Sequence, residues 1–180
     1  MAHYPAELEE HWQAGGEILL IRPIRPTDAA EHDKFFHRLS PEDIRSRFFA
    51  AVRELTPELL AKFTRLDYER DMAFIAVREA SGETVGVARL AREKDQPGVA
   101  EFAVVVQPDM QHRGLATHLM RRLLDWAPLH GVREVVGEIL ADNKGMLDFS
   151  RHLGFRLDRQ QGDPEIIEAR LRLEPPFNFP

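Results

Sequence analysis

The chain has 180 residues, 43% hydrophobic and 30% charged, which suits one soluble globular domain with its own core. The formal net charge of −6 and the lack of a Lys/Arg run argue against binding to a nucleic-acid backbone, and the absence of cysteine excludes disulfides, thiolate metal sites and a cysteine nucleophile. Because there is neither a basic leader nor an apolar run of about 20 residues, we expect a cytoplasmic protein that is neither secreted nor embedded in a membrane.

The first third of the chain predicts one strand and several short helices. Residues 17–24 are rich in Ile and Leu and lead into a proline-containing turn, which is typical of a strand. Thr27 or Asp28 can then cap a helix that runs to about Arg38. Two further helices are expected where a hydroxyl residue precedes a proline, at Ser40-Pro41 and at Thr56-Pro57.

Short strands follow from residue 71 onward. Runs rich in Val, Ala and Phe occupy residues 72–77, 84–91 and 99–106, and turn-forming residues separate them. Strands connected by such short turns pair as consecutive antiparallel hairpins. We therefore expect a three-stranded meander in the middle of the chain.

The last part of the chain predicts alternating helices and strands. Four apolar residues after Pro108 lie on one helical face, namely Leu115, Leu119, Leu123 and Trp126, and Gly131 ends that helix. A strand is expected at 132–140, a helix at 142–153 capped by Asp142 or Asn143, and two strands at 155–158 and 166–173. With no repeat or linker in residues 1–180, this order predicts a single α/β (α+β) domain with a mixed sheet.

The strongest local signal is the segment Gln111-His112-Arg113-Gly114-Leu115-Ala116, between a Val-rich strand and an amphipathic helix. The first N–H groups of a helix lack intrahelical partners and lie at the positive end of its dipole, so this loop can hold a pyrophosphate. Gly114 leaves the backbone accessible to phosphate and Ala116 keeps the next turn small. Arg113 can add a charge-assisted contact and Thr117 a hydroxyl.

An ordinary strand-to-helix turn is the alternative reading of this segment, with a glycine that only permits a tight bend. The dinucleotide-binding pattern G-x-G-x-x-G and the P-loop pattern are both absent. Rossmann-type and kinase functions therefore lack their signature.

Two motifs resemble the GNAT superfamily of N-acetyltransferases. Gln111-x-x-Gly114-x-Ala116 after the Val-rich strand is similar to motif A of the family. A later stretch is similar to motif B, and it contains Asn143, Met146, Phe149, Ser150 and Leu153-Gly154-Phe155. The resemblance covers about residues 18–173. It implies a mixed, mostly antiparallel sheet flanked by helices, in which the strands around Val104 and Val135 splay apart to admit pantetheine.

Acetyl-CoA is the cosubstrate that this resemblance implies. The positions that match the family's CoA-binding segments are Val104, Val105, Val106, Gln111, His112, Arg113, Gly114, Leu115, Ala116, Thr117, Asn143 and Met146. Asn143 has an alternative role as a helix cap. No metal is expected, since the eight histidines offer no pair at ligand spacing.

A narrower resemblance is to the acetyltransferase domain of bacterial Pat-type protein lysine acetyltransferases. The matching segments are Ile21-Arg22-Pro23-Ile24-Arg25-Pro26, Leu39-Ser40-Pro41-Glu42, Arg47-Phe48-Phe49, Asp67-Tyr68 and Glu101-Phe102-Ala103-Val104-Val105-Val106. This resemblance implies that a protein lysine accepts the acetyl group, for instance on an acyl-CoA synthetase. Phe48 and Phe49 are expected in the core or in the wall of the acceptor cleft.

Acyl transfer to an amine requires a base, because an alkyl amine with a pKa near 10.4 is almost fully protonated at neutral pH. Glu101 lies in an otherwise apolar strand and matches the family's strand glutamate, so we expect it to be the general base. A position on a solvated strand face, for instance opposite Arg92, is the alternative. The N–H of Val104 is expected to stabilise the oxyanion, whereas Ser150, where many relatives have tyrosine, is a poor acid for the leaving thiolate.

Two other functions remain open from the sequence. The acceptor could be a small amine, such as an amino acid, a polyamine or an aminoglycoside. The chain could also be a noncatalytic acyl-CoA sensor that has kept motif A. Glu101 argues against a sensor, and the missing tyrosine argues for it.

Overall fold

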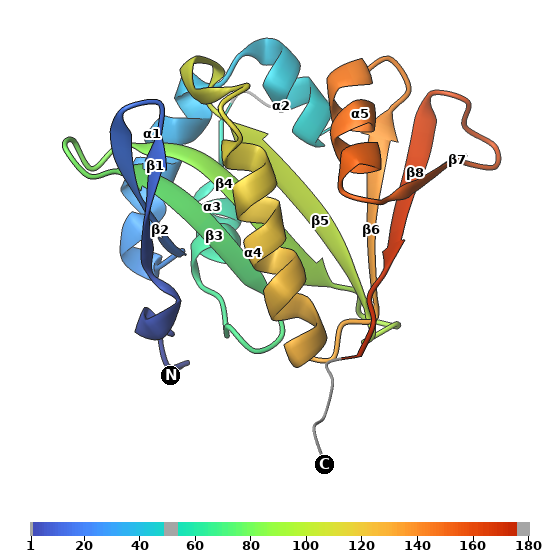
Figure 1. Cartoon of the computed structure of the whole chain (residues 1–180), viewed down its shortest axis with the longest axis horizontal. Helices are drawn as coiled ribbons and strands as arrows, with labels where there is room; N and C mark the ends of the chain where they lie inside the picture. Colours follow the sequence, from blue (N-terminus) through green and yellow to red (C-terminus); the bar gives the residue numbers. More distant parts are fainter. Residues whose placement is uncertain (1, 49–53, 176–180) are drawn as a thin grey trace.

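The computed structural model describes residues 2–48 and 54–175. They form one eight-stranded sheet with helices on both faces (Figure 1). The strands are β1 (Glu10–Ala14), β2 (Glu17–Pro23), β3 (Met72–Arg78), β4 (Thr84–Arg92), β5 (Val99–Val106), β6 (Glu134–Leu140), β7 (Arg156–Arg159) and β8 (Ile166–Arg172). The helices are α1 (Ala29–Arg38), α2 (Pro41–Phe48), α3 (Pro57–Thr64), α4 (Leu115–Leu129) and α5 (Lys144–His152), with short 3-10 turns η1 (Ala6–Leu8), η2 (Pro26–Asp28) and η3 (Pro108–Met110).

The sheet has the order β1-β2-β3-β4-β5-β6-β8-β7. Every neighbouring pair is antiparallel except β5 and β6, which are parallel. The predicted mixed, mostly antiparallel sheet is therefore confirmed.

Alternate residues of the central strands pack into two separate cores. Phe74 of β3 belongs to the core under α4, whose buried face contains the predicted Leu115, Leu119, Leu123 and Trp126. The neighbouring Ile75 belongs to the core under α1 and α3. Because side chains alternate between the faces of a strand, α4 covers one face of the sheet and α1 and α3 cover the other (Figure 1).

The single parallel pair separates soon after it begins. Residues 99–101 of β5 pair with residues 134–136 of β6, although β5 continues to Val106 and β6 to Leu140. Beyond this point the two strands diverge, as Figure 1 shows. The splayed strand pair lies where it was expected, and β5 has only β4 as a ladder partner over its last five residues.

The predicted elements from residue 17 onward are present with small shifts of their ends, but β1 and η1 were not predicted. β1 is an edge strand, and of its five residues only Ala14 is fully buried. Of the two suggested caps for α5, Asn143 is the one used, since its Oδ1 accepts a hydrogen bond from Met146 N at 3.2 Å. The expectation for the side chains of Phe48 and Phe49 lies outside what the structure describes.

Candidate active site

A groove of ≈ 1060 Å³ opens at the place where β5 and β6 diverge. Its size is near the upper end of the range for small-molecule sites, roughly 300–1,000 Å³. The wall is built from β5, the loop into α4, the end of β6, the start of α2 and the start of α5. Segments far apart in the sequence therefore meet around one elongated cavity.

The structure brings most of the sequence-predicted residues to this groove. The lining includes the predicted Glu101, Val104, Val105, Val106, Gln111, His112, Gly114, Leu115, Ala116, Thr117, Asn143 and Met146. Arg113 is not part of the lining. Its side chain lies against the β1–β2 turn, where a methyl group on Gly15 would stand 3.1 Å from Arg113 Nη1.

The loop before α4 has the geometry of an anion-binding helix N-terminus. Gly114 occupies the N-cap position with φ of 83°, a left-handed conformation that favours glycine. The first intrahelical bond in this turn runs from His118 N to Gly114 O, so the amides of residues 115–117 precede the hydrogen-bond ladder. Gln111 Nε2 donates to Val106 O at 3.0 Å and ties the loop back to β5. The amides at this helix start can therefore bind a phosphate group.

Glu101 is exposed and lines the groove near the point of divergence. Its cross-strand neighbour on β4 is Ala91, whereas Arg92 pairs with Ala100. The suggested position of Glu101 opposite Arg92 is therefore wrong, because the register of the hairpin places Arg92 one residue away and on the other face.

A second strand carboxylate, Glu138 of β6, lines the groove as well. Glu101 pairs with Val136, and Glu138 lies two residues beyond Val136, so both carboxylates are on the same face of the sheet. Glu138 was not predicted from the sequence. The signal was a polar residue at an alternating position within the predicted strand 132–140.

Helix α2 and the turn before α5 add an acidic rim to the groove. We call Glu42, Asp43 and Asp142 the acidic rim; all three line the cavity. Gln111 Nε2 lies 3.5 Å from Asp43 Oδ1, and Arg45 Nη1 lies 3.4 Å from Asp142 Oδ2. Helix α2 therefore spans between the loop before α4 and the start of α5. The acidic rim was not predicted from the sequence.

The two polar residues of the second motif have different environments. Asn143 lines the groove and also caps α5, so both of its suggested roles are compatible with its position. Ser150 is fully buried and is absent from the lining. A proton on Ser150 therefore has no direct path to a group in the groove.

Neither a metal-binding cluster nor a membrane-spanning helix is found among the described residues. These residues contain no group of three or more His, Cys, Asp or Glu side chains arranged to hold a metal ion. None of their helices has the length and apolar character needed to span a bilayer.

Known proteins resemble this chain over most of its length. The model of the acetyltransferase (GNAT) family matches residues 36–155. The chain is 36% identical over 169 residues to acetyltransferase PA5475 of Pseudomonas aeruginosa. The aligned residues cover 91% of this chain and 90% of that protein. It is 31% identical over 139 residues to acetyltransferase Pat of Mycolicibacterium smegmatis, covering 77% of this chain and 41% of that protein. Among solved structures, the GNAT domain of S. lividans PAT superposes with a TM-score of 0.87 at 25% identity, covering 95% of this chain and all 100% of that domain.

Proposed function

The chain belongs to the acetyltransferase (GNAT) family, and from this premise we propose that it transfers the acetyl group of acetyl-CoA to the side-chain amine of a protein lysine. One observation carries the proposal. The groove at the β5–β6 divergence joins a helix start whose free amides can bind phosphate, a length of strand with a free edge and the carboxylate of Glu101. An acyl-CoA-dependent N-acetyltransferase needs these three parts.

The helix start would hold the pyrophosphate of acetyl-CoA. The amides of residues 115–117 and the open backbone at Gly114 support this assignment. Pantetheine would then extend between β5 and β6 along residues 104–106, with Asn143 and Met146 of α5 on the opposite wall. The thioester would lie near the point where the strands part.

Glu101 would accept the proton of the acceptor amine, directly or through a water molecule. The freed amine nitrogen attacks the thioester carbonyl carbon, whose oxygen gains negative charge. A hydrogen bond from the Val104 N–H would stabilise that oxygen. The C–S bond then breaks, the acetyl group stays on nitrogen, and the second proton that the nitrogen must lose passes to water. CoA leaves as a thiolate, whose low basicity lets it depart without an acid from the protein.

The acceptor assignment rests on charge and on family resemblance. The acidic rim of Glu42, Asp43 and Asp142 would attract a cationic ammonium group to the groove. The similarity to Pat, at 31% identity, supports a protein lysine as acceptor. Transfer to a small amine is the second candidate, because the same rim would attract any small cation.

The acceptor is tested by offering two classes of amine in parallel. Acetyl-CoA is incubated with the protein and either a folded acyl-CoA synthetase or a panel of small amines, and products are identified by mass spectrometry. Acetylation of one lysine of the folded partner supports the proposal. Acetylation of small amines alone moves the function to metabolite acetylation, and tight CoA binding without any product indicates a sensor.

A further inference from the structure

We infer that Gln107, Asp109 and Arg78 position the pyrophosphate loop from outside the groove and thereby set the affinity for acetyl-CoA. None of these three residues is part of the groove lining. The inference rests on the proposed function, since it assumes that the loop at residues 111–117 binds the CoA pyrophosphate. It extends that function to residues that touch no substrate.

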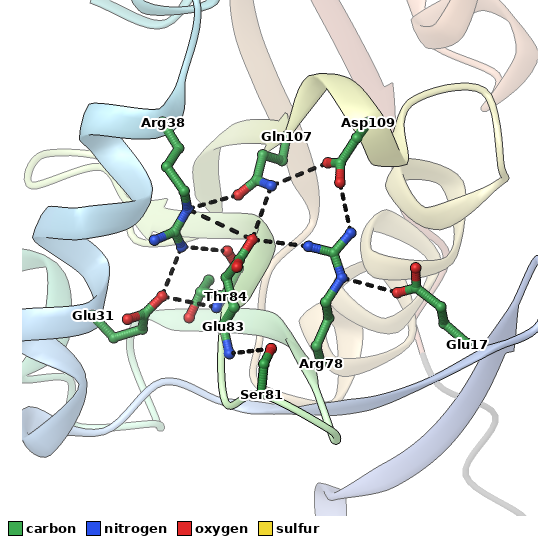
Figure 2. Close-up of polar contacts among 9 residues, drawn as sticks. All are labelled: Glu17, Glu31, Arg38, Arg78, Ser81, Glu83, Thr84, Gln107 and Asp109. Carbon is green, nitrogen blue, oxygen red and sulfur yellow. Dashed lines mark hydrogen bonds and ion pairs between the residues drawn. The ribbon is translucent and has the colours of Figure 1, made fainter.

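Gln107 connects the end of β5 to two other parts of the fold (Figure 2). Gln107 is buried, with 7% of its surface exposed. Gln107 Oε1 accepts a hydrogen bond from Arg38 Nε at 2.9 Å, and Gln107 Nε2 donates to Glu83 Oε1 at 3.1 Å. Its backbone N–H donates to Val85 O at 2.9 Å. The residue that leads into the loop is therefore fixed to α1 and to β4.

Asp109 continues the same network inside η3, one turn before the loop. Its Oδ1 accepts a hydrogen bond from Gln107 Nε2 at 3.0 Å, and its Oδ2 accepts one from Arg78 Nη2 at 2.7 Å. The hydrogen bond from Arg78 lowers the pKa of Asp109 below its usual value, so the carboxylate is ionised at neutral pH. Both oxygens of this carboxylate are therefore held by neighbouring elements.

Arg78 at the end of β3 joins three carboxylates from different segments (Figure 2). Besides Asp109, it donates to Glu83 Oε1 at 2.8 Å and to Glu17 Oε2 at 2.9 Å. Its side chain is 19% exposed, so these charge-assisted bonds are partly shielded from water. Arg78 thus anchors η3 to the hairpin between β3 and β4.

These contacts lie just before the amides that would bind phosphate. A loop that is already ordered loses less conformational entropy when a ligand binds, so the network should lower the cost of binding acetyl-CoA. The reacting groups lie elsewhere, since Glu101 and Val104 are on β5 and keep their pairing with β4. Loss of the network should therefore raise KM for acetyl-CoA and leave kcat nearly unchanged.

The test uses Gln107→Leu and Asp109→Asn with two acyl donors. Acetyl-CoA contains the pyrophosphate, whereas S-acetylpantetheine lacks it. We expect each variant to raise KM for acetyl-CoA about three- to tenfold, as for the loss of one or two ordinary hydrogen bonds. The value of kcat/KM for S-acetylpantetheine should stay the same. If Gln107→Leu folds poorly because Gln107 is buried, Asp109→Asn still tests the inference. The Asp109 side chain is 55% exposed, so its replacement should not prevent folding.

Glu17→Gln is the matched control. It removes another carboxylate partner of Arg78, on β2 rather than at the loop, and should leave KM for acetyl-CoA unchanged. The inference would be overturned if the loop variants lose kcat/KM equally with acetyl-CoA and with S-acetylpantetheine. It would also be overturned if Glu17→Gln raises KM for acetyl-CoA as much as the loop variants do. Unchanged KM in both loop variants would overturn it too, while failure of the unaltered protein to bind or use acetyl-CoA would overturn the proposed function and the inference together.

Discussion

The ring of Phe102 lies directly against the backbone of Gly137, just beyond the last paired residues of β5 and β6. A methyl group on Gly137 would stand 2.3 Å from Phe102 Cε1 and 2.8 Å from Cδ1, well inside the contact distance of two carbon atoms. The ring also contacts Phe155, with ring centroids 4.9 Å apart. Phe102 therefore fills the space between the diverging strands, and only glycine at position 137 leaves room for it.

Gly137→Ala should destabilise the fold and weaken acetyl-CoA binding. The added methyl forces the Phe102 ring to move, and overpacking of this kind costs typically about 1–3 kcal/mol. Thermal denaturation and titration with acetyl-CoA measure the two effects. Gly98→Ala is the control, since its methyl would meet Arg133 Cγ at 3.7 Å and Cβ at 3.8 Å, which are ordinary contacts. Unchanged stability and affinity in Gly137→Ala would contradict this account of the divergence.

Gly114→Ala should weaken acetyl-CoA binding beyond its effect on stability. The φ of Gly114 is 83°, where any side chain is strained, and a methyl would also stand between the backbone and a phosphate. Titration calorimetry with acetyl-CoA measures the affinity. We expect a loss of about tenfold or more, equivalent to one or two phosphate contacts.

Gly131→Ala provides a closely matched control at the other end of α4. Gly131 has φ of 82°, and in both glycines a methyl would have its nearest neighbour at 4.0 Å. Gly131 is not part of the groove lining. Both variants should lose similar stability, and only Gly114→Ala should lose affinity. Equal affinities would remove the loop from the binding site.

Ser150→Ala should leave acetyl transfer unchanged and make the protein equally or more stable. Ser150 is fully buried, and its Oγ has no hydrogen-bond partner among the described residues. A buried hydroxyl without a partner costs about 1–3 kcal/mol, so its removal carries no penalty of that kind. Steady-state rates and thermal denaturation measure the outcome. A large fall in kcat would show that Ser150 acts as the acid for the leaving thiolate.

Asp28→Asn should reduce stability at pH 7 by on the order of 3 kcal/mol, near the lower bound for removing one partner of a buried ion pair. Burial raises the pKa of Asp28, but hydrogen bonds from Arg22, at 2.7 and 2.8 Å, and from the Arg25 N–H outweigh it and lower the pKa below its usual value. Because the pKa of Asp28 is lower in the folded state than in the unfolded state, its charge stabilises the fold at pH values above the unfolded-state pKa of about 3.9. This stabilisation is lost as the pH falls through the folded-state pKa.

The unaltered protein and Asp28→Asn should therefore differ less in their free energy of unfolding below about pH 4. There Asp28 becomes protonated in the unfolded state and then in the folded state. Denaturant unfolding at pH 7 and pH 3 checks this. Asp148→Asn is the control, because its carboxylate is 78% exposed and exposed ion pairs contribute little. If the difference in free energy of unfolding between the two proteins is the same at pH 7 and pH 3, the charge of Asp28 is not what stabilises the fold.

Most of the fold could be predicted because its elements carry clear periodicity. The strands 72–77, 84–91 and 99–106 and the apolar face of α4 all appear where the sequence indicated. β1 escaped prediction because an edge strand packs on few neighbours and its residues Glu10, His11 and Gln13 are polar. Its position instead depends on tertiary contacts, such as the stacking of Trp12 on His118 with centroids 4.8 Å apart.

The site was predictable only where its residues form a local motif. Gly114 and its neighbours follow one another in the chain, so the segment, together with the family resemblance, predicted an anion-binding helix start. Glu138, the acidic rim and the network around Gln107 come from separate segments, and only the folded sheet brings them to the groove or to the loop. The side chain of Arg113 lies against the β1–β2 turn, and its contact with phosphate stays a prediction.

The rate of CoA release from acetyl-CoA, measured by thiol titration with a saturating amine acceptor, tests the central claim most directly. The unaltered protein should release CoA, and Glu101→Gln should do so at least about 100-fold more slowly, the usual range for a lost general base, with unchanged affinity for acetyl-CoA. Glu168→Gln, a strand carboxylate outside the groove lining, should keep the full rate. Equal rates for Glu101→Gln and the unaltered protein, or a loss confined to Glu138→Gln, would contradict the assignment of Glu101 as the base, and no release by the unaltered protein with any amine would contradict the acetyltransferase itself.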